Sequence, residues 1–163
     1  MNIHIIGLAG SGKTSLSRAI STAHGIPAID LDYEVYGPTG ERPASELKAR
    51  LNGILSREGW VTEGAYHEPW LDSLLTAADT IIWLDVPLRT SLFRITKRHL
   101  VAELARNNPH PGWRKLARFL TYTRRTASAQ RKETRQILAA HKAKVVRCRS
   151  SEEERSALVR LTS

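Results

Sequence analysis

Short apolar runs alternate with amphipathic stretches along the 163-residue chain. The runs are rich in β-branched residues and are bounded by glycine, proline or acidic residues, which is typical of β-strands. The stretches between them place apolar side chains three and four residues apart, as amphipathic helices do. The predicted strands are residues 2–6, 27–31, 60–64, 80–86 and 143–148.

Helices are predicted between these strands. One follows Gly12 and ends at Gly25, and the others cover residues 44–57, 70–77, 88–106 and 113–141, with a last helix from Ser151 onward. Residues 33–43 and 107–112 are rich in glycine and proline and predict loops. Strands that alternate with helices indicate an α/β fold with a parallel sheet covered on both faces. Ligands of such folds bind beyond the carboxyl ends of the strands, which here carry Gly7, Asp30, Asp32, Glu63, Asp85 and Arg149.

The first apolar run leads into the nonapeptide GLAGSGKTS, in which Gly7, Gly12, Lys13 and Thr14 match the phosphate-binding P-loop pattern. The glycines let successive backbone N–H groups point into one concave space, and the following helix adds its positive N-terminal end. Lysine then reaches the β- and γ-phosphates, and the threonine hydroxyl is placed to ligate Mg²⁺. The residues expected to bind the nucleotide here are Gly7, Gly10, Ser11, Gly12, Lys13, Thr14 and Ser15.

Composition sets the broad class of the protein. A chain of this length, 41% hydrophobic, predicts one domain over residues 1–163. A single cysteine, Cys148, excludes a disulfide within the chain and suits a reducing cytoplasm, and no apolar run is long enough to span a membrane. Of the net charge of +9, residues 89–135 contribute +11, from 13 Lys or Arg and two acids. Charge concentrated in this way indicates an anionic partner, either phosphates in an active site or nucleic acid.

Among P-loop proteins, the pattern favours a small kinase. The D-x-x-G and N-K-x-D strings of Ras-type GTPases do not occur, and no glutamate follows Asp85 to activate water for ATP hydrolysis. The P-loop spacing resembles that of nucleoside monophosphate kinases and shikimate-type kinases. The whole chain resembles the adenylate-kinase-like family of DNA topology modulation proteins. The pieces that carry this resemblance are residues 7–15, 29–32, 60–66 and 78–87.

The resemblance implies a P-loop three-layer sandwich of the nucleoside- and nucleotide-kinase type, with five parallel strands in the order 2-3-1-4-5. It implies an acceptor-binding segment at residues 33–59, an arginine-rich helical lid within residues 89–135, and Mg-ATP as phosphoryl donor. It leaves the acceptor open. The family usually has Asp-Gly-Asn-Tyr followed by arginine, whereas residues 63–69 read EGAYHEP. The missing arginine argues against a monophosphate acceptor bound as in adenylate kinase.

Five polar side chains are candidates for the chemistry. By analogy with shikimate-like kinases, Asp32 is the expected base for an alcohol acceptor and Asp30 belongs to the metal shell, while the alternative is an ordinary capping or turn pair. Glu63 and Thr14 are the other metal-shell candidates. Asp85 has two interpretations, either a functional acid or a turn or sheet-end residue without a chemical role.

The basic residues are interpreted either as phosphate or nucleotide contacts or as ordinary surface cations. Arg94 and Arg98 are four residues apart on one helix and share a face, and Arg124 on the next helix is placed to join them over the transferred phosphate. Most of the other cations are expected to form a solvated face. Arg149 either packs on adenine, as the resemblance implies, or is a plain loop residue.

The alternative function is that of an ATP-binding protein whose basic helices bind DNA. The segment lacks a recognisable DNA-binding motif and has few aromatic residues, which disfavours this hypothesis. The favoured interpretation is a cytoplasmic, Mg-dependent ATP kinase with a small-molecule acceptor of the nucleoside, nucleotide or metabolite type. The sequence leaves monomer and homodimer open.

Overall fold

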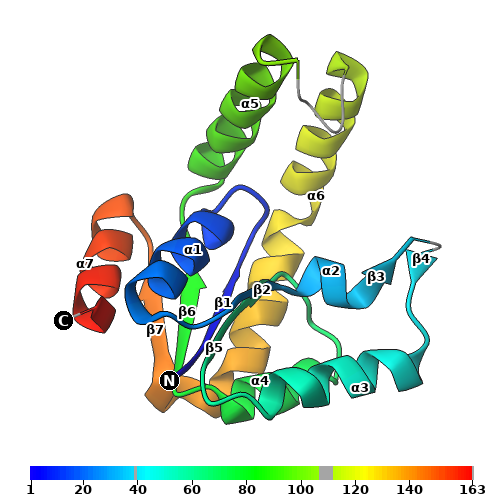
Figure 1. Ribbon diagram of the computed structural model, residues 1–163. Coiled ribbons are helices and arrows are strands. Elements are labelled where there is room, and N and C mark those ends of the chain that lie inside the picture. Colours follow the sequence, from blue (N-terminus) through cyan, green and yellow to red (C-terminus); the bar gives the residue numbers. More distant parts are fainter. Residues whose placement is uncertain (39, 107–111, 163) are drawn as a thin grey trace.

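The computed structural model describes residues 1–38, 40–106 and 112–162, and its centre is a five-stranded parallel sheet (Figure 1). The strands lie in the order β2-β5-β1-β6-β7. Two further short strands pair with each other in a separate hairpin, so the order in the main sheet is the predicted 2-3-1-4-5. The main strands are β1 (Asn2–Gly7), β2 (Ala28–Asp30), β5 (Trp60–Gly64), β6 (Thr80–Leu84) and β7 (Val145–Cys148).

Helices cover both faces of the sheet and complete the predicted α/β sandwich. On one face, α1 (Lys13–His24) and α7 (Ser151–Thr162) lie side by side (Figure 1) and enclose a core that contains Ile5, Ile20 and Ala157. Strand residues alternate between the two faces, since Ile82 points into this core and its neighbour Trp83 into the other. The second face is covered by α2 (Leu31–Val35), α3 (Ala44–Leu55), α4 (Leu71–Ala77) and the 3₁₀ helix η1 (Leu138–Lys144).

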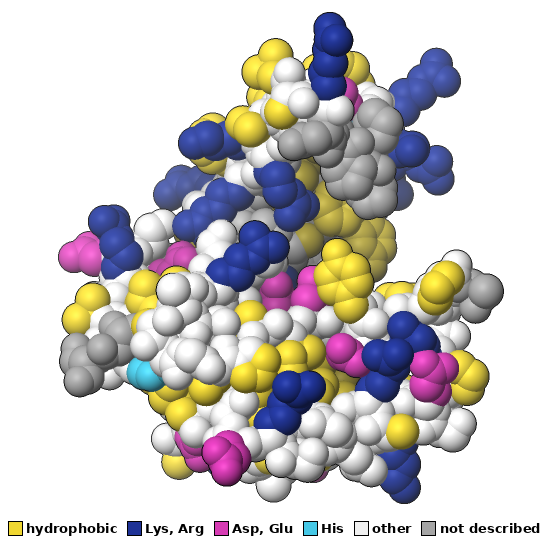
Figure 2. Space-filling model, in the orientation of Figure 1, with side chains coloured by type: hydrophobic (Ala, Val, Ile, Leu, Met, Phe, Trp, Pro, Cys, Tyr) yellow, Lys and Arg dark blue, Asp and Glu magenta, His cyan; other side chains and the backbone are white. Residues whose placement is uncertain are grey.

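Two long helices rise from the sheet as a separate lobe (Figure 1), α5 (Leu88–Leu104) and α6 (Trp113–Ile137). Much of the Lys and Arg surface lies on this lobe (Figure 2), as the charge count predicted. The predicted helix at 113–141 is too long, because α6 ends at Ile137 and the chain tightens into η1 before β7. The break predicted at residues 107–112 falls on positions 107–111, which lie outside the described residues.

The largest departure from the sequence-based elements is in residues 31–43. The predicted strand at 27–31 ends one residue early, because Leu31 begins α2 and is fully buried against the second core. The predicted loop contains α2 and the hairpin of β3 (Tyr36–Gly37) and β4 (Gly40–Glu41). Across the parts of the chain that the structure describes, no helix is both long and apolar enough to cross a bilayer.

Candidate active site

The P-loop leaves β1 at Gly7 and turns into α1 at Lys13. A Cβ on Gly7 would lie 2.7 Å from the Leu84 carbonyl oxygen, so a side chain at this position would clash with β6. Gly10 and Gly12 have φ angles of +74° and +112°, in the left-handed region that glycine adopts without strain. The glycines of the motif are therefore required by the turn and by its close contact with the neighbouring strand.

The N-terminal end of α1 opens into the loop. Gly12 precedes the helix, and no side chain caps its first N–H groups, which leaves them to bind an anion. The Lys13 ammonium donates hydrogen bonds to the carbonyl oxygens of Gly7 and Leu8, at 3.0 and 3.3 Å. Burial lowers the pKa of Lys13, and the carboxylates of Glu63, Asp32 and Asp30 oppose this shift. Three acids thus face the P-loop lysine.

Asp30, the last residue of β2, and Asp32, in the first turn of α2, both line the same cleft. The Asp30 side chain accepts a hydrogen bond of 2.9 Å from the Asp32 backbone N–H and so caps α2. Burial raises the pKa of Asp30. Asp30 therefore caps α2, and its side chain also lines the cleft beside Asp32.

Glu63 lies beside Asp30, since the two residues are paired in the parallel register of β5 and β2. Its side chain is buried, and burial raises its pKa, whereas a hydrogen bond with the Thr14 hydroxyl and the charge of Lys13 oppose the rise. One carboxylate oxygen, Oε1, has no hydrogen-bond partner within the described residues. A buried unpaired carboxylate oxygen costs free energy unless a cation or a water molecule satisfies it.

The oxygen atoms of Thr14, Asp30 and Glu63 suit Mg²⁺, which prefers hard oxygen ligands. In the described parts of the chain, no three His, Cys, Asp or Glu side chains come close enough to form a metal cage of their own. This agrees with the usual coordination of Mg²⁺ in kinases, by one or two protein oxygens, water and the phosphates of the substrate. The residues therefore fit the ion only together with a bound nucleotide.

Tyr66 is a site residue that the sequence analysis did not single out. Its hydroxyl donates a hydrogen bond of 2.6 Å to Oδ1 of Asp32, and burial together with this carboxylate raises the pKa of Tyr66. The phenol therefore stays protonated and holds the Asp32 carboxylate in one orientation. The two residues are 34 positions apart, and only the packing of α2 against the end of β5 brings them together.

A cleft of about 1430 Å³ joins these groups. Acidic side chains lie at the foot of the basic helical lobe (Figure 2), where the sheet and the lobe meet. Ten of the predicted site residues line the cleft: Gly10, Gly12, Lys13, Thr14, Ser15, Asp30, Asp32, Glu63, Arg94 and Arg98. Gly7 and Ser11 belong to the loop without lining the cleft. Topology thus collects most of the predicted site at one edge of the sheet.

The predicted arginines behave differently from one another. Arg94 donates hydrogen bonds to the Ser11 carbonyl oxygen and to Ser151 Oγ, and it pairs with Glu154 at 3.4 Å. It therefore ties α5 to the P-loop and to α7. Arg98 lies on the same face, as its spacing predicted. Arg124 and Arg149 are exposed and are not among the cleft-lining residues.

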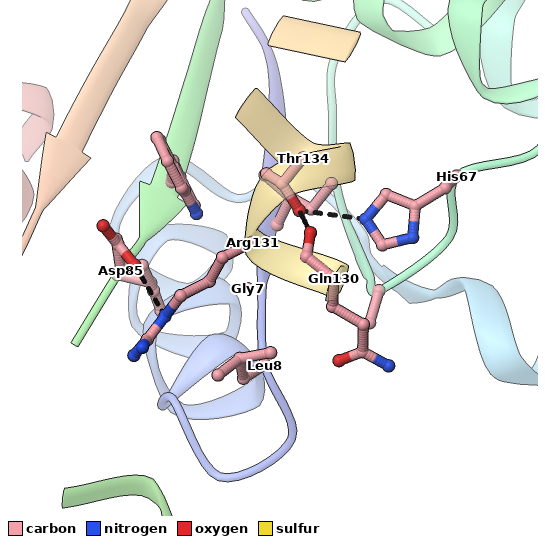
Figure 3. A pocket seen from close by; sticks show the side chains of 11 residues that line it. Gly7, Leu8, His67, Asp85, Gln130, Arg131 and Thr134 are labelled. Carbon is pink, nitrogen blue, oxygen red and sulfur yellow. Dashed lines mark hydrogen bonds and ion pairs between the residues drawn. The ribbon is translucent and has the colours of Figure 1, made fainter. Parts of the chain in front are cut away.

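A second, smaller cavity lies behind the P-loop, between the ends of β1 and β6 and helix α6 (Figure 3). Its volume of about 10 Å³ holds at most one water molecule. At its edge, Asp85 forms ion pairs with Arg131, at 3.0 Å, and with Arg147, whose guanidinium also lies over the Trp83 ring. Asp85 is thus fully paired, which favours the structural interpretation of this acid.

The fold and the P-loop place the chain in the structural class of the P-loop kinases. Among solved structures, it is similar to a shikimate kinase from Acinetobacter baumannii in complex with shikimate, with a TM-score of 0.58 and 18% identity over 98% of this chain and 89% of that one. It is also similar to a gluconokinase from Sinorhizobium meliloti 1021, with a TM-score of 0.56 and 20% identity over 99% and 93% of the two chains.

Among curated proteins, the chain is 28% identical over 123 residues to a shikimate kinase from Rhizobium meliloti (strain 1021). The match covers 66% of this chain and 64% of the length of that relative. No protein-family profile matches the chain. The comparisons support the P-loop kinase part of the expected resemblance. They lend no support to the DNA topology modulation part or to a DNA-associated function.

Proposed function

We propose that the protein is a Mg-dependent phosphotransferase that transfers the γ-phosphate of ATP to a hydroxyl group of a small molecule. The observation that carries the proposal is one cleft in which the P-loop groups Lys13 and Thr14 face the carboxylates of Asp30, Asp32 and Glu63. Phosphoryl transfer needs this combination of a phosphate cradle, metal ligands and a base. The relatives named shikimate kinase and gluconokinase support a small-metabolite acceptor.

In this proposal the donor lies along the P-loop. Backbone N–H groups of the loop bind the β- and γ-phosphates, and Lys13 exchanges its bonds to loop carbonyls for bonds to phosphate oxygens. Thr14, Asp30 and Glu63 would hold Mg²⁺, which supplies charge neutralisation on the β- and γ-phosphates when it is bound. The γ-phosphate end faces these acids, so the nucleoside of ATP extends the opposite way, past Gly12 toward Glu154.

Asp32 is the proposed base. The acceptor oxygen bonds to the γ-phosphorus while the bond from that phosphorus to the bridging oxygen of ADP breaks, and the hydroxyl proton passes to Asp32. The leaving ADP keeps the bonding electron pair. Tyr66 fixes the carboxylate of Asp32 through one oxygen, and the other oxygen is left for the acceptor. Tyr66 is therefore a positioning residue.

The arginines of the lobe are proposed to stabilise the transferred phosphate. Arg98 lies in the cleft, within reach of the equatorial oxygens once a nucleotide is bound. Arg94 anchors α5 to the loop that binds the phosphates. Arg124 requires closure of the lobe to reach the phosphate, as lids of such enzymes do. Arg149, at the end of β7, is proposed to pack on adenine.

The proposal is tested by ADP release from Mg-ATP in the presence of a pooled acceptor panel, with the Lys13→Ala protein beside it. The panel holds nucleosides, nucleoside monophosphates, polyols and hydroxy acids. We expect acceptor-dependent ADP release that falls about 10³-fold in the variant, because a preorganised cation is lost from the transferred phosphate. Full activity of Lys13→Ala at unchanged thermal stability contradicts the site, and ATP binding without release for any acceptor contradicts the kinase.

A further inference from the structure

All four tyrosines of the chain line the active-site cleft, and one of its two phenylalanines joins them. The other aromatic residues, four tryptophans and Phe93, lie elsewhere. Most of the cleft rings are open to solvent, with exposed fractions of 76% for Tyr33, 51% for Tyr36, 58% for Tyr122 and 39% for Phe119. Exposed rings gathered at one place are typical of a binding site.

The rings lie on opposite walls of the cleft. Tyr33 comes from α2 and Tyr36 from β3, on the side of the carboxylates, while Phe119 and Tyr122 come from α6 (Figure 1). This aromatic part adjoins Asp32, to which Tyr66 is bonded, whereas the nucleoside of ATP is proposed to lie along the Gly12 and Glu154 flank of the same cleft. The rings are therefore available to the acceptor.

The charge of the aromatic part is unexpected for so basic a protein. Helix α6 is rich in arginine, yet the residues that it contributes to the cleft are all neutral: Phe119, Tyr122, Thr123, Thr126 and Gln130. Among the described residues of the opposite wall, Arg42 is the one cation, and its Nη1 is paired with Glu46 at 2.6 Å. The other cations that line the cleft, Lys13, Arg94 and Arg98, belong to the P-loop end and to α5. With three carboxylates at the reacting end, this surface disfavours an anionic acceptor.

One buried polar group in this part also lacks a partner. Thr123 lines the cleft with its side chain almost fully buried, and its Oγ1 has no hydrogen-bond partner within the residues that the structure describes. This oxygen has almost no accessible surface, so the Thr123 side chain would have to rotate before a ligand in the cleft could bond to it. Gln130, two turns further along α6, adds an amide to the same wall.

We infer that the phosphoryl acceptor is a nucleoside. This inference rests on the proposed function and names its substrate class. The planar base stacks among the rings of Tyr33, Tyr36, Phe119 and Tyr122, its polar edge bonds to the Gln130 amide, and a sugar hydroxyl reaches Asp32. Stacking suits any base, because every base has a π-face. A cleft of about 1430 Å³ exceeds the usual 300–1000 Å³ of a site for one small ligand and so has room for donor and acceptor together.

The test is calorimetric titration of five nucleosides (adenosine, guanosine, cytidine, uridine and thymidine) into protein saturated with the magnesium complex of a non-hydrolysable ATP analogue. Shikimate, gluconate and the matching nucleoside monophosphates are titrated beside them. We expect at least one nucleoside to bind 10-fold or more tightly than any of these anions. Tyr122→Leu should weaken that binding about 5- to 150-fold through lost stacking, and Tyr122→Phe should restore it. Phe93→Leu, on an exposed ring outside the cleft, should leave it unchanged.

The possible outcomes separate the inference from the function on which it rests. Preferred binding of shikimate or gluconate, or no nucleoside binding at all, overturns the nucleoside inference, while the ADP-release assay judges the kinase independently. If the ATP analogue abolishes nucleoside binding and Tyr122→Leu leaves it unchanged, the base binds in the donor site. This result also overturns the inference. Tyr122-dependent nucleoside binding without any nucleoside-dependent ADP release supports the ring site and contradicts the kinase.

Discussion

Glu63 and Asp85 lie at the same edge of the sheet, on the two strands that flank β1, and their surroundings differ sharply. Asp85 is held by Arg131 and Arg147, so its charge is compensated within the protein. Glu63 is somewhat more buried, but one of its oxygens has no partner in the described structure, and burial raises its pKa. The two acids occupy comparable positions, but the charge of Asp85 is compensated by two arginines, whereas Glu63 has no arginine partner among the described residues and keeps one oxygen unpaired.

This difference shows that position at the carboxyl edge of a parallel sheet does not by itself make an acid functional. A carboxylate already paired with two guanidinium groups has little capacity left for a metal ion or a proton. A buried acid without such a partner is destabilising for the fold, and it is retained where a ligand completes it. We therefore propose a structural role for Asp85 and a chemical role for Glu63, together with Asp30 and Asp32.

The largest effect is expected when the proposed base is removed. Asp32→Asn keeps the shape of the side chain and can still accept the Tyr66 hydrogen bond, but it cannot take a proton. Turnover should fall about 10²- to 10⁴-fold while the affinity for Mg-ATP stays within a few-fold. Measurement of kcat and of the ATP dissociation constant checks this, with Asp72→Asn, outside the cleft, as the control. Equal losses of turnover and ATP affinity would remove Asp32 from the role of base.

The next largest effect is expected for Glu63→Gln, which should lower activity and raise stability at the same time. Glu63→Gln should lower turnover by about 10²-fold, because a metal-shell oxygen loses its charge. The same change should raise Tm at pH 7 by about 2–4 °C, the shift that about 1 kcal/mol gives in a chain of this length. A Glu63→Gln protein with a lower Tm and full turnover would contradict the contrast drawn between Glu63 and Asp85.

The gain from Glu63→Gln should also depend on pH. Because burial raises the pKa of Glu63 in the folded protein, the unfolded chain ionises first as the pH rises. The wild-type protein therefore loses stability from the ordinary glutamate pKa of about 4 up to the raised folded value. Urea unfolding should show the two proteins equal in stability below that range and the variant more stable above it. A gain that persists at low pH would have another cause.

Asp85→Asn should give the reverse pattern. It leaves Arg131 and Arg147 without a carboxylate, so the free energy of unfolding should fall by about 1–3 kcal/mol, while kcat changes only a few-fold. Urea unfolding and the ADP-release assay check the two expectations. The double variant Asp85→Asn with Arg147→Gln should cost less than the sum of the single changes, since the two side chains interact directly. Additive costs would mean that the ion pair contributes little.

Much of the fold follows from local pattern. The five strands and most helices agree with the predictions from apolar spacing and from glycine and proline, because these signals act between residues close in sequence. The strand order agrees with what the family resemblance implied. The P-loop is local in the same sense, and its backbone angles at Gly10 and Gly12 are those its glycines predict. The short helix that begins at Leu31 was missed because burial of this side chain in the core outweighs the strand pattern around it.

The sequence by itself therefore determined the P-loop, the parallel sheet and the edge at which acids and phosphate groups meet. Only the tertiary structure decided which acids are compensated, since the Asp85–Arg147 pair joins residues 62 positions apart. It also placed Tyr66 against Asp32 and turned the neutral face of a basic helix toward the cleft. Contacts of this kind depend on how distant elements pack, and no periodicity along the chain encodes them.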